Sequence, residues 1–562
     1  MEEEKAESKE HHEEHLHSHE HHEHKPAHHT NHSYEDKITE RKEKIKSWIK
    51  DPYNLALIGI ILLAFAFRLY YFWITKSQPL WWDEAEYMST AKHWIFGIPY
   101  DINPQRPPLF QLLAAIFLFV GFSEATIKFL IVLIPSIFLV FAIYLVGKEM
   151  FSKKIGLFAA LGSSFVWSYL FWTERFQPDF FSMCFQMLSF LFFWKMIKNP
   201  KIKYAVCTGI FAALGFYFKI SALLVPISMF LFILFLEGFW FFKKKHYWIV
   251  LASFTGSMIP FMIWQFFIFG NPLAFAPSYI VLDVRSQWNY GWMALTFFQS
   301  FPKLLFFILF LIGLALAIFR IAILGDIILK DKKNRENPEV LSLITLIVVA
   351  LFYVFFIKGA IEDRWVFLII PFIFYFSAIG FFKISDYFEK INKILVFIFL
   401  IAVFGFFIYA QVQHTSQLID AKKTSYYQIK DAAIWIKDNS DKNEASLSVS
   451  YTQTIAYSER PIYTYSRMSE ENFTKLLMEK KPKYIMVSII EPNHPDWIIQ
   501  NPRYNDGSWA ILLPYFNSSI RIGANQQVSA DLKKSVEKGK FRFTLVYPNE
   551  INGVFVYKID YL

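Results

Sequence analysis

Long apolar segments recur along the chain, and they restrict its fold more than any other feature. Most of these runs are close to 20 residues long, which is about the length of an α-helix that crosses the ~30 Å hydrocarbon core of a bilayer. Apolar residues make up 54% of the 562 residues and charged residues only 19%. Because one soluble core cannot contain so many such runs, we predict a polytopic α-helical membrane protein with about 11 to 13 transmembrane helices.

The first 36 residues have the opposite character, because they form a polar tail that holds 11 of the 15 histidines. Such a segment cannot bury a core, so we predict a disordered, cytoplasmic tail. Loose binding of zinc, nickel or copper is the alternative reading, and a solvated tail is favoured. The two cysteines, Cys184 and Cys207, lie in apolar runs and indicate no disulfide or zinc site.

Basic residues set the expected topology of the membrane part. Six of them lie between residues 37 and 50, before the first apolar run at 54–75, and place that end in the cytoplasm. The later basic loops are separated from each other by pairs of apolar runs, as expected if all of these loops are cytoplasmic. The segments 174–179 and 218–221 are then expected outside. The run 107–121 is only 15 residues long, so we predict partial or interfacial insertion for it.

After the last predicted span, 394–412, the sequence changes to short strand-like runs and amphipathic helical patterns. We therefore predict a cytoplasmic tail at 1–36, a membrane domain at 37–412 and an extracytoplasmic α/β domain at 413–562, in a multi-pass protein of the plasma membrane. The expected strands are 445–451, 483–490, 541–547 and 553–559, and the clearest helix is 471–481.

Charged residues from distant loops fall on the expected outer surface, where basic residues are normally sparse. A charge at membrane depth is costly and usually faces a cavity or a partner. We therefore predict one polar cavity that binds an anion and performs acid/base chemistry. Its expected residues are Arg106, Lys219, Arg285, Lys358 and Arg364, with Asp83, Glu84, Glu174 and Asp179.

Several of the charges also have a purely structural reading. Arg68 suits a side chain that snorkels from the first span to the surface. Glu174 suits a local pair with Arg175, and Arg364 suits a local pair with its acidic neighbours. Glu86 suits simple solvation.

The stretch "WWDEAEYMSTAKHWIFGIPYDINPQRPPLFQLLAAIF" (81–117) resembles the first external loop of GT-C glycosyltransferases. The similarity is to the PMT-2 or aminoarabinose-transferase-like group, relatives of dolichyl-phosphate-mannose protein mannosyltransferases. An acidic pair followed by Tyr opens that loop, here Asp83-Glu84 and Tyr87, and an Arg-Pro-Pro element closes it at 106–108. The later elements also have counterparts, in Asp179 of "ERFQPDFFS", Lys219 of "GFYFKISALLVP" and Arg364 of "EDRWVFLIIPFI". The resemblance covers approximately residues 54–412.

The resemblance implies a GT-C-like fold and a reaction. A monosaccharide would pass from a polyprenyl (dolichyl or undecaprenyl) phosphate to an acceptor hydroxyl outside the membrane, with inversion. Asp83 would be the general base, assisted by Asp179 and Glu84, while cations would stabilise the leaving phosphate. The residues expected to bind this phosphate are Arg106, Lys219 and Arg364, and those expected to bind substrate are Tyr87, Trp82, Glu174 and Arg285. The interfacial aromatic belt explains Trp82 and Tyr87 equally well.

Some features depart from the family pattern or leave alternatives open. Gln105 stands where many relatives carry an acid, and Ile220-Ser221 replace small residues, which leaves the sugar and the acceptor (protein, lipid or glycan) undetermined. A magnesium or manganese ion held by Asp83, Glu84 and Asp179 stays open. A secondary transporter for an anionic or lipid-linked substrate is the alternative function, although it should show repeats and a midplane site. A non-catalytic surface or assembly protein is a third class of function, but it would not need external cations from so many loops. No feature indicates nucleic-acid binding.

Overall fold

The computed structural model describes residues 34–276, 304–323, 336–356 and 362–562, apart from 490, 492, 505, 506, 524, 526 and 550–552. It divides the chain into two units, residues 1–54 and residues 55–562. In the first unit, α1 (Tyr34–Lys50) is followed by the start of α2 (Pro52–Thr75). The rest of α2 and the helices and sheets described below belong to the second unit.

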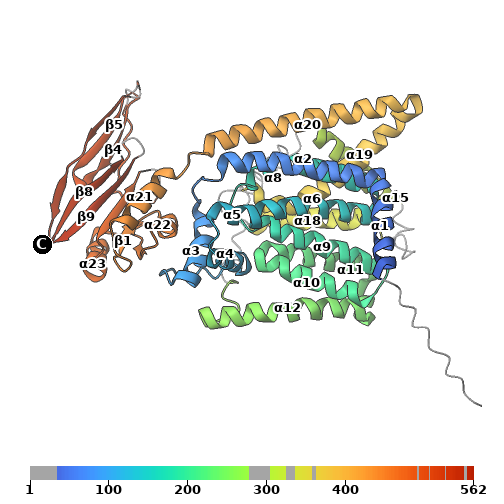
Figure 1. Ribbon diagram of the computed structural model, residues 1–562, viewed down its shortest axis with the longest axis horizontal. Coiled ribbons are helices and arrows are strands. Elements are labelled where there is room, and N and C mark those ends of the chain that lie inside the picture. The colour runs from blue at the N-terminus through green and yellow to red at the C-terminus, as the bar shows by residue number, and fades with distance from the viewer. Residues whose placement is uncertain are drawn as a thin grey trace, which may run out of the picture. The chain divides into compact units, whose positions relative to one another are not determined.

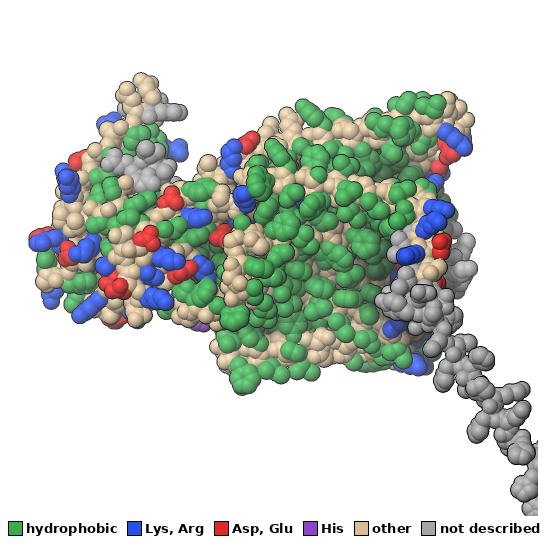
Figure 2. All heavy atoms as spheres, viewed as in Figure 1, with side chains coloured by type: hydrophobic (Ala, Val, Ile, Leu, Met, Phe, Trp, Pro, Cys, Tyr) green, Lys and Arg blue, Asp and Glu red, His purple; other side chains and the backbone are tan. Residues whose placement is uncertain are grey.

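Within the described ranges, eight helical segments are long and apolar enough to cross a membrane. Hydrophobic side chains cover the face of these helices that Figure 2 shows, whereas charged side chains gather over the C-terminal part. The chain therefore has the composition of a multi-pass membrane protein. The eight segments are α2, Glu124–Met150 (α5, η1 and α6), α9 (Asp179–Lys198), Ile220–Lys243 (η2, α11 and η3), α12 (Lys245–Phe269), α15 (Leu304–Ile323, of which Leu305–Ile323 qualifies), Asp363–Ile391 (η4 and α19) and α20 (Lys393–Lys422).

The other described helices of the membrane part are α3 (Trp82–Phe96), α4 (Leu109–Phe119), α7 (Lys153–Phe165), α8 (Trp167–Trp172), α10 (Ile202–Phe218) and α18 (Pro338–Phe356). Helix α4 has 11 residues, which gives a length of about 16 Å at 1.5 Å per residue. It is therefore too short to span a bilayer, as expected for the run 107–121. The expected total of 11 to 13 spans stays a prediction, because residues 277–303, 324–335 and 357–361 lie outside the described ranges.

The described residues of the C-terminal part form two sheets and three α-helices, which Figure 1 shows beside one another. The six-stranded sheet has the order β2-β1-β3-β9-β8-β7, with β1 parallel to β2 and β3 and the other pairs antiparallel. The smaller antiparallel sheet has the order β4-β5-β6. The elements are α21 (Tyr427–Asp438), β1 (Ser446–Ser448), α22 (Tyr451–Ser458), β2 (Ile462–Tyr463), α23 (Glu470–Lys480), β3 (Tyr484–Ser488), β4 (Trp509–Leu513), η5 (Pro514–Phe516), β5 (Ser518–Ile522), β6 (Val528–Asp531), β7 (Ser535–Lys538), β8 (Phe541–Asn549) and β9 (Val554–Tyr561).

Strand β3 is buried on both faces of the larger sheet. Its side chains alternate between the faces, as in any strand: Tyr484 and Met486 pack in the cluster of α21, and Ile485 and Val487 pack in the cluster of α23. This explains why "KYIMVSII" reads as a continuous apolar run rather than as an alternating one. The C-terminal α/β architecture is as predicted from the sequence.

Helix α22 of the C-terminal part packs against α3 (Figure 1). The Lys92 ammonium on α3 donates to the carbonyl of Ala456 at 2.6 Å and pairs with Glu459 at 2.8 Å. The backbone N–H of Leu80, just before α3, donates to the Tyr457 hydroxyl at 2.7 Å. The helix that begins with Trp82 and Asp83 is therefore fixed by C-terminal residues.

Candidate active site

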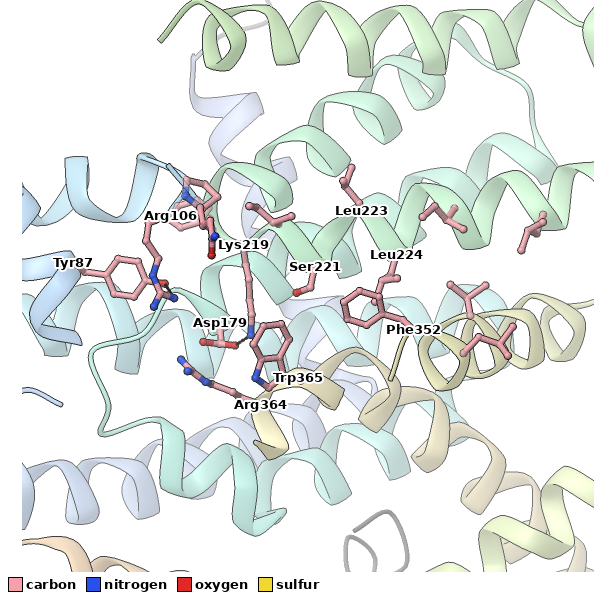
Figure 3. Close-up of a pocket in the computed structure, with 18 residues that line it drawn as sticks. Tyr87, Arg106, Asp179, Lys219, Ser221, Leu223, Leu224, Phe352, Arg364 and Trp365 are labelled. Atoms are coloured by element: carbon pink, nitrogen blue, oxygen red, sulfur yellow. Dashed lines mark hydrogen bonds and ion pairs between the residues drawn. The ribbon is translucent and has the colours of Figure 1, made fainter. Parts of the chain in front are cut away.

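A cavity of about 430 Å³ opens between the α3–α4 loop, the start of α9, the junction of α10 with α11, the end of α18, and η4 (Asp363–Ile369). Figure 3 shows its two different ends. Tyr87, Arg106, Asp179, Lys219 and Arg364 gather at one end. The other end is apolar, and its lining includes Leu223, Leu224, Ile227, Leu231, Val348, Leu351 and Phe352.

Each cation of the cavity comes from a break in helical structure. Arg106 lies in the loop just before α4, next to Pro107, which lacks a backbone N–H. Lys219 is extended between α10 and η2, and Arg364 lies in the 3₁₀ turn before α19. Such breaks bring charged side chains of distant segments to one end of the apolar bundle.

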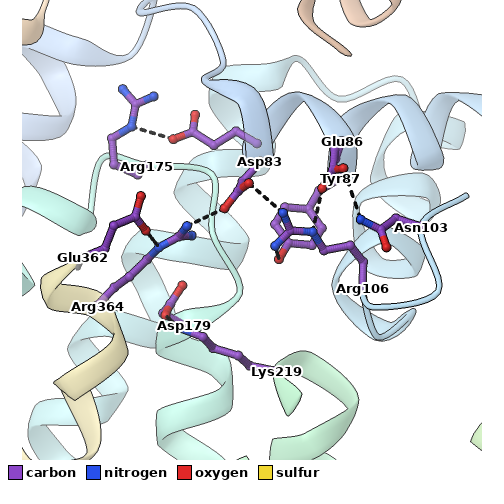
Figure 4. A network of polar contacts seen from close by, with 11 residues as sticks. Asp83, Glu86, Tyr87, Asn103, Arg106, Arg175, Asp179, Lys219, Glu362 and Arg364 are labelled. Atoms are coloured by element: carbon purple, nitrogen blue, oxygen red, sulfur yellow. Dashed lines mark hydrogen bonds and ion pairs between the residues drawn. The ribbon is translucent and has the colours of Figure 1, made fainter. Parts of the chain in front are cut away.

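Asp83 connects two of these cations (Figure 4). One carboxylate oxygen accepts from Nη2 of Arg106 at 2.6 Å, and the other accepts from Nη2 of Arg364. Arg106 Nε also donates to Glu86 at 2.6 Å, and Arg364 Nε donates to Glu362. Both guanidiniums therefore have a second carboxylate partner besides Asp83.

Lys219, the third cation, pairs with a different carboxylate. Lys219 pairs with Asp179, the first residue of α9, where the helix dipole favours a negative charge. Its ammonium also lies 5.2 Å from the centre of the Trp365 ring. Every cation in the described lining of the cavity is thus neutralised by at least one carboxylate.

The arginines determine the protonation state of Asp83. Burial alone would raise the pKa of its carboxyl, but the charges and hydrogen bonds of Arg106 and Arg364 lower this pKa to about 2. Asp83 is therefore ionised at neutral pH, and it is a weak base while both guanidiniums contact it.

The structure brings together six of the eleven residues expected at the site. Arg106, Lys219, Arg364, Asp179 and Tyr87 line the cavity, and Asp83 contacts two of them. Gln105, Ile220 and Ser221, where the sequence departs from the family pattern, also line it. Arg285, like Lys358, lies outside the described residues.

Three expected residues lie elsewhere. Glu84 is fully buried and pairs at 2.5 Å with Arg175, whose guanidinium lies 3.8 Å from the centre of the Trp81 ring. The Trp82 indole N–H donates to Glu491 of the C-terminal part at 3.1 Å. Glu174 is buried, and burial raises its pKa well above the usual value against the opposing charges of Arg175 and Lys128.

Other readings of single charges are corrected by the structure. Arg68 does not snorkel, because it is fully buried and donates to the carbonyl of Ser164 at 2.8 Å, near the break between α7 and α8. The salt-bridge partner of Arg175 is Glu84 rather than Glu174. Glu86 is not simply solvated, since it contacts Arg106.

Asp363 belongs to the site, although the sequence predicts it only as a local partner of Arg364. It accepts from the Trp172 indole N–H at 2.8 Å and from the Ser168 hydroxyl. The Trp172 ring lies 5.0 Å from the Arg364 guanidinium carbon. Helix α8 therefore positions Arg364, and no local pattern in the sequence indicates this pairing across almost 200 residues.

The carboxylates do not form a metal site. Asp83, Glu84 and Asp179 each contact a different cation, and the described residues include no cluster of three His, Cys, Asp or Glu side chains arranged to hold a metal ion. The residues therefore do not fit the magnesium or manganese ion left open from the sequence.

Residues 105–264 match the family model described as dolichyl-phosphate-mannose-protein mannosyltransferase. This segment contains Arg106, Asp179 and Lys219. The structure is similar to that of ArnT from Cupriavidus metallidurans bound to undecaprenyl phosphate, at 11% identity, 78% coverage of this chain, 93% coverage of that chain and a TM-score of 0.55. The chain has the GT-C fold. The resemblance seen in the sequence is thereby confirmed.

Two archaeal structures share this GT-C fold. The Archaeoglobus fulgidus oligosaccharyltransferase complex with Zn and sulfate is 14% identical, with 77% of this chain and 68% of that chain covered and a TM-score of 0.55. AglB from the same organism, in complex with an inhibitory peptide and a dolichol-phosphate, is 12% identical, with coverages of 87% and 75% and a TM-score of 0.54. No curated protein matches the sequence.

Proposed function

We propose that the protein transfers a monosaccharide from a polyprenyl phosphate to an acceptor hydroxyl on the outer side of the plasma membrane, with inversion. The observation that carries this proposal is the two-ended cavity, with three cations at one end and aliphatic side chains at the other. A prenyl phosphate has the matching chemistry, because its head is an anion and its tail is a hydrocarbon. Undecaprenyl phosphate and dolichol-phosphate in the similar structures support the same class of donor.

The donor phosphate has to compete with carboxylates for the cavity cations. Its oxygens suit the guanidinium groups of Arg106 and Arg364, which can bind phosphate in a bidentate manner. Asp83 shares both guanidiniums, so a phosphate that takes these contacts leaves Asp83 less strongly stabilised as an anion. The pKa of Asp83 then rises, and it becomes a stronger base only when donor is bound.

In the proposed reaction the acceptor oxygen attacks the anomeric carbon from the face opposite the phosphate. The bond between that carbon and the phosphate oxygen breaks, and the hydroxyl proton passes to Asp83. Prenyl phosphate leaves with its charge stabilised by Arg106, Lys219 and Arg364. No step requires a metal ion.

The remaining residues receive distinct roles in this proposal. Tyr87 and Asp179 contact the sugar, and Gln105 and Ser221 contribute to the choice of sugar from their places in the cavity lining. Glu84 is a positioning residue, because its buried pair with Arg175 holds the first turn of α3 that carries Asp83. Trp82 and Glu174 act outside the donor cavity, and Arg285 remains a proposed substrate residue.

The donor assignment is tested by measuring binding of a short-chain polyprenyl phosphate to the purified full chain in detergent. Arg106→Ala should weaken binding about 10- to 100-fold, which corresponds to the loss of one or two charge-assisted hydrogen bonds. Arg320→Ala is the matched control, because Arg320 also pairs with a carboxylate, Glu339, and does not line the cavity. Equal affinities of the unmodified protein and Arg106→Ala would contradict the phosphate site.

A further inference from the structure

Two adjoining hollows lie in the C-terminal part, separate from the donor cavity. The first, of about 570 Å³, is lined by Leu512 of β4 and by described residues before this strand, namely Ile489, Glu491, Asn493, His494, Asp496, Ile499, Gln500, Asn501 and Pro502. The second, of about 480 Å³, is lined by Arg503, Tyr504, Gly507, Ser508 and Trp509. Asn501 lines both hollows, so they adjoin at this residue, and the two hollows together are called the groove below.

The first hollow is polar and contains no Lys or Arg in its described lining. Its polar side chains are Glu491, Asn493, His494, Asp496, Gln500 and Asn501. Two carboxylates without a cation disfavour an anionic ligand such as a phosphate. Carboxylate and amide groups provide the acceptors and donors that hydroxyl groups need.

His494 adds a neutral acceptor to this wall. Burial lowers its pKa to about 4, so the ring is uncharged at neutral pH. Its Nε2 lies 2.6 Å from the carbonyl of Ser488 and therefore carries the proton. The other ring nitrogen, Nδ1, is buried and has no hydrogen-bond partner among the described residues, so it is an unsatisfied acceptor within the wall of the hollow.

The second hollow supplies aromatic surface. Tyr504 is 43% and Trp509 is 39% exposed, so part of each ring is accessible to a ligand. Arg521 lies 5.2 Å from the centre of the Tyr504 ring and fixes this side chain. Partly exposed rings next to amides and carboxylates suit a ligand with both C–H faces and hydroxyl groups.

The groove is connected to the donor site by one hydrogen bond. Glu491 in its wall accepts from the indole N–H of Trp82 at 3.1 Å, and Trp82 directly precedes Asp83. A ligand held in the groove would therefore be anchored next to the helix turn that carries the proposed base.

We propose that this groove binds a neutral saccharide, the carbohydrate part of the acceptor. The role as acceptor site rests on the proposed transferase function, whereas saccharide binding does not. A basic peptide would also suit the two carboxylates, but the exposed aromatic rings and the amides favour the saccharide.

Saturation-transfer NMR on the purified full chain tests the proposal, with methyl hexosides and neutral disaccharides as probes. Trp509→Ala and Asn501→Ala should each weaken binding about fivefold to tenfold, as expected for the loss of one packing or hydrogen-bonding contact. Tyr561→Ala is the control for Trp509, because Tyr561 is equally exposed at 39% on β9. Asn472→Ala on the exposed face of α23 is the control for Asn501.

Three results would overturn the groove as a saccharide site: no saccharide binding by the unmodified protein, binding of a Lys/Arg-rich peptide in place of the saccharides, or unchanged binding by both groove variants. Prenyl-phosphate binding is measured on the same preparation. Its absence would count against the proposed transferase, while saccharide binding would be judged by the groove variants alone.

Discussion

Asp83 is the residue on which both arginines of the donor cavity converge. Because Arg106 and Arg364 each keep another carboxylate partner, Glu86 and Glu362 respectively, removal of the Asp83 charge leaves neither guanidinium alone. Substitutions of Asp83 therefore report on its chemistry without leaving either arginine unpaired.

The low pKa of Asp83 predicts a defined acid sensitivity. A carboxyl whose pKa falls from 3.8 in the unfolded chain to about 2 in the fold stabilises the protein above pH ~4, and this stabilisation is lost as the pH falls towards 2. The difference in thermal midpoint between the unmodified protein and Asp83→Asn should therefore shrink between pH 4 and pH 2. A difference that stays constant across this window would show that the arginines do not lower the pKa of Asp83.

The buried pair of Glu84 and Arg175 predicts a large loss of stability on substitution. Glu84→Gln leaves the Arg175 charge buried without its counter-ion, at a cost of about 3–5 kcal/mol. The matched control is Glu86→Gln, because Glu86 also pairs with an arginine, but Arg106 keeps Asp83 as a second carboxylate partner, so the loss should be smaller than for Glu84→Gln. Thermal unfolding in detergent measures both, and equal effects would contradict the positioning role of Glu84.

At the scale of elements, α15 and α19 approach each other at two glycines. A Cβ on Gly380 would lie 2.2 Å from the carbonyl oxygen of Leu309, and one on Gly313 would lie 1.8 Å from that of Phe376. These are backbone atoms, so the helices must separate to make room. The close approach holds α19, and therefore Arg364 at its N-terminal end, against the rest of the bundle.

Gly380→Ala should thus destabilise the protein by about 1–3 kcal/mol, as overpacking does. Gly405→Ala in α20 is the control, because a Cβ there meets no atom within 4 Å and alanine is the better helix former. Thermal midpoints of the two variants give the comparison. An equal midpoint for both would show that α15 and α19 are not packed as closely as described.

At the scale of the whole molecule, the sequence predicts the membrane bundle and the cavity because both depend on patterns that are local. Apolar runs give the helices, and positive charges at breaks between runs point to Arg106, Lys219 and Arg364. The strands β1, β3, β8 and β9 are also predicted, although Tyr451, placed in a strand, begins α22 instead.

The pairings inside the site could not be predicted in the same way, because they join residues far apart in the chain. Asp83 meets Arg364, Glu84 meets Arg175, and Trp172 meets Asp363 only through tertiary packing. The roles of Glu86 as a partner of Arg106 and of the groove around Asn501 likewise depend on how loops fold back. Sequence patterns therefore predict which charges are unusual, and the fold decides which of them meet.

The most direct test of the proposed mechanism compares sugar transfer and prenyl-phosphate binding in the unmodified protein and in Asp83→Asn. Loss of the general base should lower the transfer rate about 10²- to 10⁴-fold. Binding of prenyl phosphate should be retained or become tighter, because the carboxylate that competes for Arg106 and Arg364 is gone. Transfer at a near-normal rate by Asp83→Asn, or a loss of binding as large as that of Arg106→Ala, would contradict the account.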